Sequence, residues 1–416
     1  MGTWLLALAC YGMSDIELTV IDGSESAEQE DQEIEEVPGL DDPGGWLYTL
    51  DAVTGIDLIF SLESWEALSV DAYTKVRADI VINGDRVNDI GVRLKGRYGS
   101  YRDLSDKAGF LVDFNYFVQG QTFHGLEQLN LNNMVQDPSY LHDYMAYQVY
   151  GLLEVPCPRV GYAWVTVQVL QEESTIFDWD YGLYANVEAY DDVFLSRVFE
   201  EPDGRLYDGD YWMSPDWSWY SLVDFHEELQ DYFELDEGED VGLEDIRAIT
   251  AALDVHRFLP DFYEVVDPLV DLDQYTRIWA AEAWVGQYDG YAYNRNNFRV
   301  YFDPGNEGRA IFMPWDHDWA FYSGTPLDYP LGRLTRACSF NETCNQDFLR
   351  HLWSLTPKVA EADLQGQMDQ VIALIDPWIE QDPRGESSPR AINSSRYELR
   401  RWLDNRDETL SYYFPE

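Results

Sequence analysis

The segment from Tyr288 to Asp318 reads YDGYAYNRNNFRVYFDPGNEGRAIFMPWDHD. It consists of two acidic motifs joined by two short apolar runs, with turn residues at 303–305 between the runs. Apolar runs of this length on either side of a Pro-Gly turn predict a β-hairpin. Because the outer ends of the two strands of a hairpin lie side by side, we expect Asp289 and Asp316 to lie close together.

The two acidic motifs contain the residue types that phosphoryl transfer requires. One carboxylate must orient the attacking hydroxyl group, and further oxygen ligands must hold magnesium beside the phosphates. Asp289 is the candidate for the first role and Asp316 with Asp318 for the second, since Mg²⁺ prefers hard oxygen ligands. A single aspartate in such a loop is more often a turn or helix cap than a ligand, so a structural role stays open at this point.

Outside this segment the chain divides into a β-rich first half and a helical second half. Short alternating runs from Trp46 onward predict strands, interrupted by one helix that follows Asp137 and ends before Pro156. The second half has longer helical patterns, with the hairpin between helices. The predicted fold class is α+β, with a β-rich N-terminal lobe at 46–190 and a mostly helical C-terminal lobe at 191–416.

The elements that we expect can be given as ranges. Strands are expected at 47–60, 78–82, 91–95, 110–114, 160–170, 181–187, 297–302 and 310–314. Beyond the first helix, further helices are expected at 243–253, 272–285, 347–355, 359–379 and 396–413.

The charge balance is strongly acidic. The 416 residues include 78 Asp and Glu against 27 Lys and Arg, a formal net charge of −51. Such a surface repels the phosphate backbone of nucleic acid and anionic membranes, so neither is an expected partner. The charge alone indicates only a solvated acidic surface.

Lysine is much rarer than arginine in this chain. It occurs four times, at 75, 95, 107 and 358, against 23 arginines. A lysine is expected to persist where a compact ammonium on a flexible stem is needed, as in contact with a nucleotide phosphate. Lys95 and Lys107 lie in one segment and are the candidates.

The N-terminal ten residues form an apolar run that ends in small residues and Cys10. This pattern resembles a bacterial lipoprotein signal with Cys10 as the lipidated residue. The run lacks a basic region before it and is too short to span a membrane. We therefore expect a secretion or lipoprotein signal at 1–21, an acidic flexible linker at 22–45, and an exported protein at the bacterial cell surface or in the periplasm.

Of the three further cysteines, one pair is spaced so that a disulfide could form, which fits an oxidising compartment. Cys338 and Cys344 flank a short loop that a disulfide could close, whereas Cys157 is expected to be a buried free thiol. The six histidines show no zinc-ligand spacing with a cysteine.

Four blocks, in this order, resemble the CotH family of spore-coat kinases. They are 91–96 with 107–114; 129–133 with 137–139 and the following helix to 159; 181–188 continuing to 199; and 289–318. The resemblance implies a bilobal, protein-kinase-like fold. It also implies an atypical protein kinase that transfers the γ-phosphoryl group of ATP, with Mg²⁺, to Ser or Thr hydroxyls of a protein substrate.

The resemblance also implies roles for particular residues in the second half. Asp289 is similar to the catalytic-loop aspartate that orients the substrate hydroxyl. Asp316 and Asp318 are similar to the metal-binding acids, and either Asn294 or Asn297 would help to hold the metal.

In the first half, the resemblance implies a nucleotide-binding wall. Lys95 and Lys107 would contact phosphate, and Asp143 would orient one of them as an ion pair. Arg97 lies in the loop that would cover the phosphates, and Glu188 would lie at the hinge near the adenine.

Two departures from the family pattern support an alternative. The stretch 204–208 ends in aspartate where the family often has lysine, and the loop 97–102 is bulkier than expected. The 15 Trp and 29 Tyr could also bind carbohydrate. The alternative is thus an inactive CotH-like adhesin or binding protein. A glycoside hydrolase is disfavoured, because Asp316 and Asp318 share one loop.

Overall fold

The computed structural model describes residues 42–214 and 220–415. These residues belong to one unit, Asp42–Glu416. The expected signal at 1–21, with Cys10, and nearly all of the expected linker at 22–45 lie outside the described residues.

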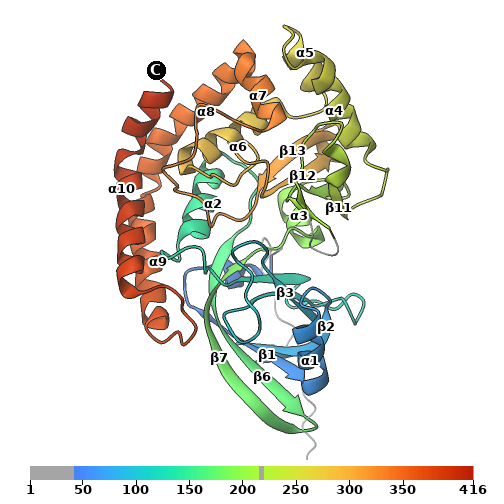
Figure 1. The fold of residues 1–416 in the computed structure, drawn as a ribbon, viewed down its shortest axis with the longest axis vertical. Helices are drawn as coiled ribbons and strands as arrows, with labels where there is room; N and C mark the ends of the chain where they lie inside the picture. The colour runs from blue at the N-terminus through green and yellow to red at the C-terminus, as the bar shows by residue number, and fades with distance from the viewer. Residues whose placement is uncertain (1–41, 215–219, 416) are drawn as a thin grey trace, which may run out of the picture. The chain divides into compact units, whose positions relative to one another are not determined.

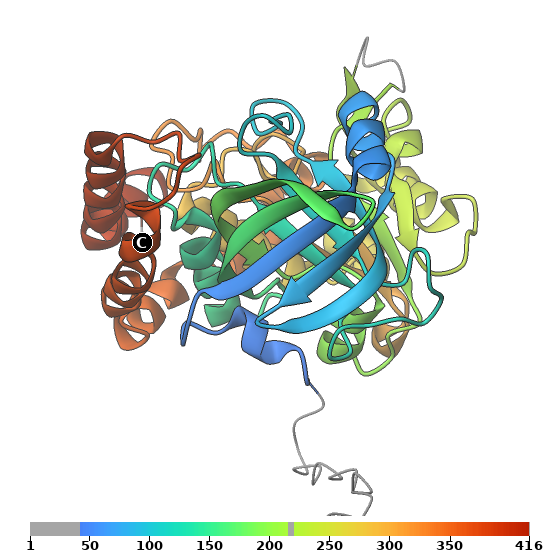
Figure 2. The ribbon, with the colours of Figure 1, turned by 90° about the horizontal axis from the view of Figure 1, so that it is seen from below.

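The first half of the described chain forms a closed seven-stranded barrel in the order β1-β2-β3-β4-β5-β7-β6 (Figures 1 and 2). β1 and β6 pair in parallel and close the barrel, whereas the other neighbours are antiparallel. The strands are β1 Thr54–Ser61, β2 Val76–Ile82, β3 Asp85–Lys95, β4 Gly109–Asp113, β5 Gln128–Asn132, β6 Val160–Gln171 and β7 Ser174–Val187.

The barrel follows from alternation of apolar and polar side chains. In β2, Val76, Ala78, Ile80 and Ile82 are buried, while the side chains between them are exposed or half-buried. Because successive side chains of a strand point to opposite faces, this pattern gives β2 one inward apolar face. The predicted strands from 78 to 187 are confirmed, although β5 was not predicted.

Two helices interrupt the barrel, where one was expected. The predicted helix is α2, His142–Leu152, and its first amides are capped by the carboxylate of Asp137 at 2.7 and 2.8 Å. The second helix, α1, spans Leu62–Val70, and Ser61 caps it by accepting a hydrogen bond from the amide of Ser64. The strand predicted at 47–60 is wrong at its start, because a 3₁₀ turn at Gly45–Tyr48 precedes β1.

The second half is mostly helical, with a small sheet inside it. The hairpin of β12 (Phe298–Asp303) and β13 (Arg309–Pro314) is confirmed, with Phe298 opposite Pro314. It belongs to a four-stranded sheet of order β11-β8-β12-β13. The other elements are α3 Asp192–Val198, β8 Arg205–Asp208, β9 Trp212–Met213, β10 Tyr220–Ser221, β11 Glu234–Glu237, α4 Glu244–His256, α5 Phe262–Val266, α6 Leu272–Val285, α7 Arg333–Phe340, α8 Glu342–Glu361, α9 Leu364–Ile379 and α10 Pro389–Tyr413.

One predicted helix is divided in the structure. The range 359–379 was expected to be continuous, but α8 ends at Glu361 and α9 begins at Leu364. Asp363 takes a left-handed conformation (φ 50°), and its carboxylate caps α9 by accepting a hydrogen bond from the amide of Gly366. The break therefore turns the chain, and α9 and α10 lie along one side of the molecule (Figure 1).

The fold class is α+β, with a β-barrel, a smaller sheet and ten α-helices within the described residues. Within the described residues, no helix is both long enough and apolar enough to span a bilayer. The disulfide between Cys338 and Cys344 is present, as predicted, and joins α7 to α8. Cys157 is a free thiol, as predicted, and burial raises its pKa to about 12.

Candidate active site

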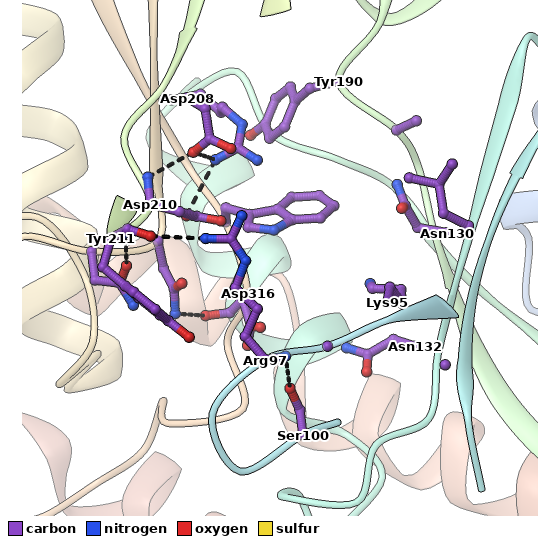
Figure 3. A pocket seen from close by; sticks show the side chains of 18 of the residues that line it. Lys95, Arg97, Ser100, Asn130, Asn132, Tyr190, Asp208, Asp210, Tyr211 and Asp316 are labelled. Atoms are coloured by element: carbon purple, nitrogen blue, oxygen red, sulfur yellow. Dashed lines mark hydrogen bonds and ion pairs between the residues drawn. The ribbon is translucent and has the colours of Figure 1, made fainter. Parts of the chain in front are cut away.

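A cavity of about 400 Å³ opens between the barrel and the helical half, and we call it the cleft (Figure 3). Barrel strands β3, β4 and β5 and the loop after β3 line one side, and the chain around the hairpin lines the other. The residues that line it include Lys95, Arg97, Ser100, Asn130, Asn132, Asp208, Asp210, Tyr211, Asp236, Asp289, Asn296, Asn297, Arg299, Trp315 and Asp316.

Asp289 lies in the loop that follows α6. Gly286 ends the helix in a left-handed conformation (φ 62°), which turns the chain toward the cleft. The carboxylate of Asp289 accepts hydrogen bonds from the side-chain amides of Asn294, Asn296 (3.0 Å) and Asn297 (3.2 Å). Burial raises the pKa of Asp289, and the three amide donors oppose this shift. The loop therefore holds the carboxylate in one orientation.

Glu282 positions this loop and was not predicted. It is buried in α6, and its carboxylate accepts hydrogen bonds from the backbone amides of Tyr291 (3.2 Å) and Ala292 (2.9 Å). Burial raises its pKa to about 8. The available signal was a single acidic residue within the apolar run 278–285.

Asp316 and Asp318 follow β13 directly. Asp316 is held in a left-handed conformation (φ 46°) and accepts a hydrogen bond from the amide of Asp318 at 3.2 Å. Burial, together with the neighbouring carboxylate of Asp143, raises the pKa of Asp316 to about 6. Burial and the carboxylates of Asp316 and Asp143 raise the pKa of Asp318 well above its ordinary value. Oδ2 of Asp318 is buried and has no hydrogen-bond partner among the described residues. Neither Asp316 nor Asp318 forms an ion pair with a basic side chain of the described residues.

The donor atoms around these aspartates are of the type that suits a hard cation. Within the described residues, no three His, Cys, Asp or Glu side chains converge as a metal-binding group. Asp316 and Asp318 supply carboxylates, and Asn294 and Asn297 bond to Asp289 through their nitrogens. No hydrogen bond with another described residue uses the Oδ1 atom of either asparagine, so oxygen donors of the type that Mg²⁺ takes are present.

Lys95 lies on the barrel side of the cleft, opposite Asp316 (Figure 3). Burial lowers its pKa, while Asp316, Asp143 and Asp318 raise it. The other three lysines pair with Asp113, Asp382 and the carbonyl oxygen of Leu152. Lys95 has no ion pair or hydrogen bond with any described residue, and its ammonium lies 5.6 Å from the ring of Trp315. It is the lysine that can take a ligand.

Lys107 lies elsewhere, and the structure does not support its predicted contact with phosphate. Its side chain is 1% exposed and pairs with the carboxylate of Asp382, in the loop between α9 and α10. Asp382 also accepts a hydrogen bond from the amide of Leu183 at 3.0 Å. Lys107 is absent from the described lining of the cleft. This ion pair joins the loop before β4 of the barrel to the loop between α9 and α10 of the helical half.

Arg97 lies in the cleft as expected. Nη1 donates to the carbonyl oxygen of Tyr211 at 2.8 Å, and the Arg97 amide donates to Oγ of Ser100 at 3.2 Å. Gly96 and Gly99 have φ values of 94° and 89°, which an L side chain rarely adopts. The loop thus bends over the cleft and is tied to the opposite side.

Asp143 and Glu188 are placed differently from the predictions. Asp143 accepts hydrogen bonds from the amide of His317 (3.0 Å) and from Asn132 (2.9 Å), so it holds the acidic loop to α2 instead of forming an ion pair with a lysine. Glu188 pairs with Arg159 and Arg197 at 2.7 and 2.6 Å. The residues that follow it, Ala189 and Tyr190, line the cleft.

A second acidic group in the cleft was not predicted. Arg299, from β12, pairs with Asp208 at 2.7 Å and Asp210 at 3.2 Å, and its Nε lies 3.6 Å from Asp236. Burial and neighbouring acids raise the pKa of Asp210 to about 7 and of Asp236 to about 6. An arginine within the apolar strand FRVYF was the available signal.

Comparisons with known proteins identify the family. The family described as CotH kinase protein matches residues 92–410. The inner spore coat protein H of Bacillus subtilis (strain 168) is 25% identical over 254 residues, which cover 58% of this chain and 61% of that protein. The crystal structure of the Helicobacter pylori proinflammatory kinase CtkA aligns with a TM-score of 0.30 and 11% identity, covering 76% of this chain and 93% of that one. Because the family match spans more than half of its length, this chain belongs to the CotH kinase family.

Proposed function

We propose that this protein is an atypical protein kinase that transfers the γ-phosphoryl group of Mg-ATP to Ser or Thr hydroxyls of a protein substrate. One observation carries the proposal: an uncommitted lysine, Lys95, lies across one cavity from Asp289 and Asp316. Family membership supports it, and so does the position of the cleft between the barrel and the helical half.

Asp289 has the surroundings of a base that orients a hydroxyl group. Three amides hold its carboxylate, and it lines the cleft. In the proposed reaction the substrate hydroxyl donates its proton toward Asp289 while its oxygen bonds to the γ-phosphorus, and the bond to the ADP oxygen breaks. The raised pKa of Asp289 favours acceptance of that proton.

Lys95 and Arg97 supply positive charge for the phosphates of ATP on the barrel side. Asp316 and Asp318, with Asn294 and Asn297, would hold Mg²⁺ on the opposite side. When bound, the metal would neutralise charge on the phosphate oxygens.

The test is incorporation of labelled phosphate from ATP by the full chain, with and without Mg²⁺. We expect Asp316→Asn to lower the rate at least about 100-fold, because it removes one charge from the proposed metal site. The matched control is Asp303→Asn, at the other end of the same hairpin, which keeps the oxygen that accepts from Gly305. If wild-type protein shows neither incorporation nor an ATP-dependent rise in melting temperature at any Mg²⁺ concentration, the inactive adhesin replaces the kinase.

We also propose that the protein is exported and anchored through a lipid at Cys10. The disulfide between Cys338 and Cys344 supports an oxidising compartment. ATP is scarce there, so phosphorylation would precede export. Fractionation with labelled fatty acid tests this proposal, which fails if Cys10→Ala leaves lipid labelling unchanged.

A further inference from the structure

A second cavity, of about 320 Å³, lies in the helical half and contains an unusual concentration of positive charge. Four arginines line it: Arg257 after α4, Arg295 from the loop that carries Asp289, and Arg333 and Arg336 from α7. We call it the arginine pocket. In a chain of net charge −51, four guanidinium groups around one cavity form a local reversal of charge.

Nearby carboxylates neutralise only part of this charge. Asp254 pairs with Arg333 and lies 3.8 Å from Arg257, and buried Asp224 lies 3.9 Å from Arg295. Four guanidinium groups therefore face two carboxylates, a formal excess of two positive charges.

Two donors in the pocket are unused. Nε of Arg295 is buried without a hydrogen-bond partner among the described residues. The exposed side chain of Arg336 makes no ion pair or hydrogen bond within the described part of the chain. A buried unsatisfied donor is costly, so a bound acceptor would stabilise this arrangement.

The rim of the pocket is apolar. Phe258 lines it and is 60% exposed, and it packs edge to face against Phe340, which is 70% exposed, at a centroid distance of 5.4 Å. Leu259 beside them is 45% exposed. An apolar rim next to the partly neutralised arginines matches a peptide side chain next to an anionic group, and a free inorganic anion would leave the rim uncovered.

We propose that the arginine pocket binds the phosphate monoester of a phosphorylated peptide segment, with an apolar residue of that segment on Phe258. A phosphate monoester carries a charge of about −1.5 to −2 at neutral pH, close to the excess in the pocket, and its oxygens accept forked hydrogen bonds from guanidinium groups. A single carboxylate would balance only half of the excess.

The position of the pocket relates this binding to the cleft. Residues 289–297 form one loop, in which Asp289, Asn296 and Asn297 line the cleft and Arg295 lines the arginine pocket. A docked phosphopeptide therefore lies beside the loop that carries Asp289. The binding itself needs neither ATP nor catalysis, so its test is separate from the test of kinase activity.

The experiment is fluorescence anisotropy on the full chain without nucleotide. The probe is a short labelled peptide with one phosphoserine next to a phenylalanine, compared with the same peptide carrying serine or glutamate. We expect the phosphopeptide to bind best, and Arg336→Ala, in which an exposed side chain is removed, to weaken it about ten-fold. Phe258→Ala should weaken it less. The matched control is Arg390→Ala, an exposed arginine in α10 away from the pocket, which should change nothing.

Each other outcome overturns the proposal. Equal affinity for the three peptides would show that binding does not require the phosphate group. Unchanged affinity of both Arg336→Ala and Arg257→Ala for the phosphopeptide would show that it does not bind in the arginine pocket. Displacement of the peptide by inorganic phosphate at equal concentration would show a free-anion site, without a peptide partner.

Discussion

Lys95 ends strand β3, and Lys107 lies in the loop between β3 and β4. Although the two lysines are close in the sequence, their surroundings in the structure are opposite. Lys95 faces the cleft without an ion pair among the described residues, whereas Lys107 is buried against Asp382. The difference is one of partners: a lysine whose charge is satisfied within the protein stabilises the fold, and one whose charge is unsatisfied beside a cavity can bind a ligand. Scarcity of lysine in the sequence does not separate the two.

Lys107→Met should have the largest effect on stability. It leaves the buried carboxylate of Asp382 without its partner, so we expect the free energy of unfolding to fall by about 3–5 kcal/mol. Denaturant unfolding measures this change. The double variant Lys107→Met, Asp382→Leu should recover part of the loss; equal loss in the single and double variants would contradict the assignment of a structural ion pair.

Lys95→Met should act on catalysis instead. We expect the rate of phosphate transfer to fall about 100-fold or more, because positive charge opposite Asp316 is removed, while the melting temperature stays within a few degrees. Steady-state kinetics and thermal unfolding of the same sample separate the two effects. A large drop in melting temperature with normal turnover would make Lys95 a structural residue like Lys107.

Glu282→Gln changes a buried carboxyl group that positions the loop carrying Asp289 through backbone hydrogen bonds. Its amide would face a backbone N–H with its own donor, so we expect a loss of about 2–3 kcal/mol. The folded pKa of about 8 lies above the ordinary value of 4.5. Between these values the folded protein holds a proton that the unfolded chain has released, so this contribution to stability falls as pH rises through the window. Stability curves from pH 5 to 8 should lose that component in the variant.

Cys338→Ser with Cys344→Ser should have the smallest effect. The disulfide closes a loop of few residues, so its removal should cost about 2 kcal/mol or less. Because neither cysteine lines the cleft, turnover should stay unchanged in the described arrangement. A loss of turnover without a change in the free energy of unfolding would connect this disulfide to the cleft. It would also weaken the distinction between residues that stabilise the fold and residues that bind ligands.

Local patterns predicted much of the fold. The barrel strands from 78 onward other than β5, together with α2, α6 and the hairpin, follow from alternation, helical periodicity and turn residues, which act over neighbouring residues. The break at Asp363 was missed because the flanking residues continue a helical pattern, and only a left-handed residue ends it. Closure of the barrel depends on the parallel pairing of β1 with β6, a long-range contact.

For the site, the sequence by itself determined the acids that one hairpin brings to the same end, Asp289 and Asp316, because a short connection allows few arrangements. Only the tertiary structure decided which lysine faces them. The partner of Lys107 lies 275 residues away in the sequence, beyond any local pattern. The same holds for the four arginines of the second pocket, which come from three separate segments. Burial and pairing, which set the free energy of a charged group, are properties of the folded chain.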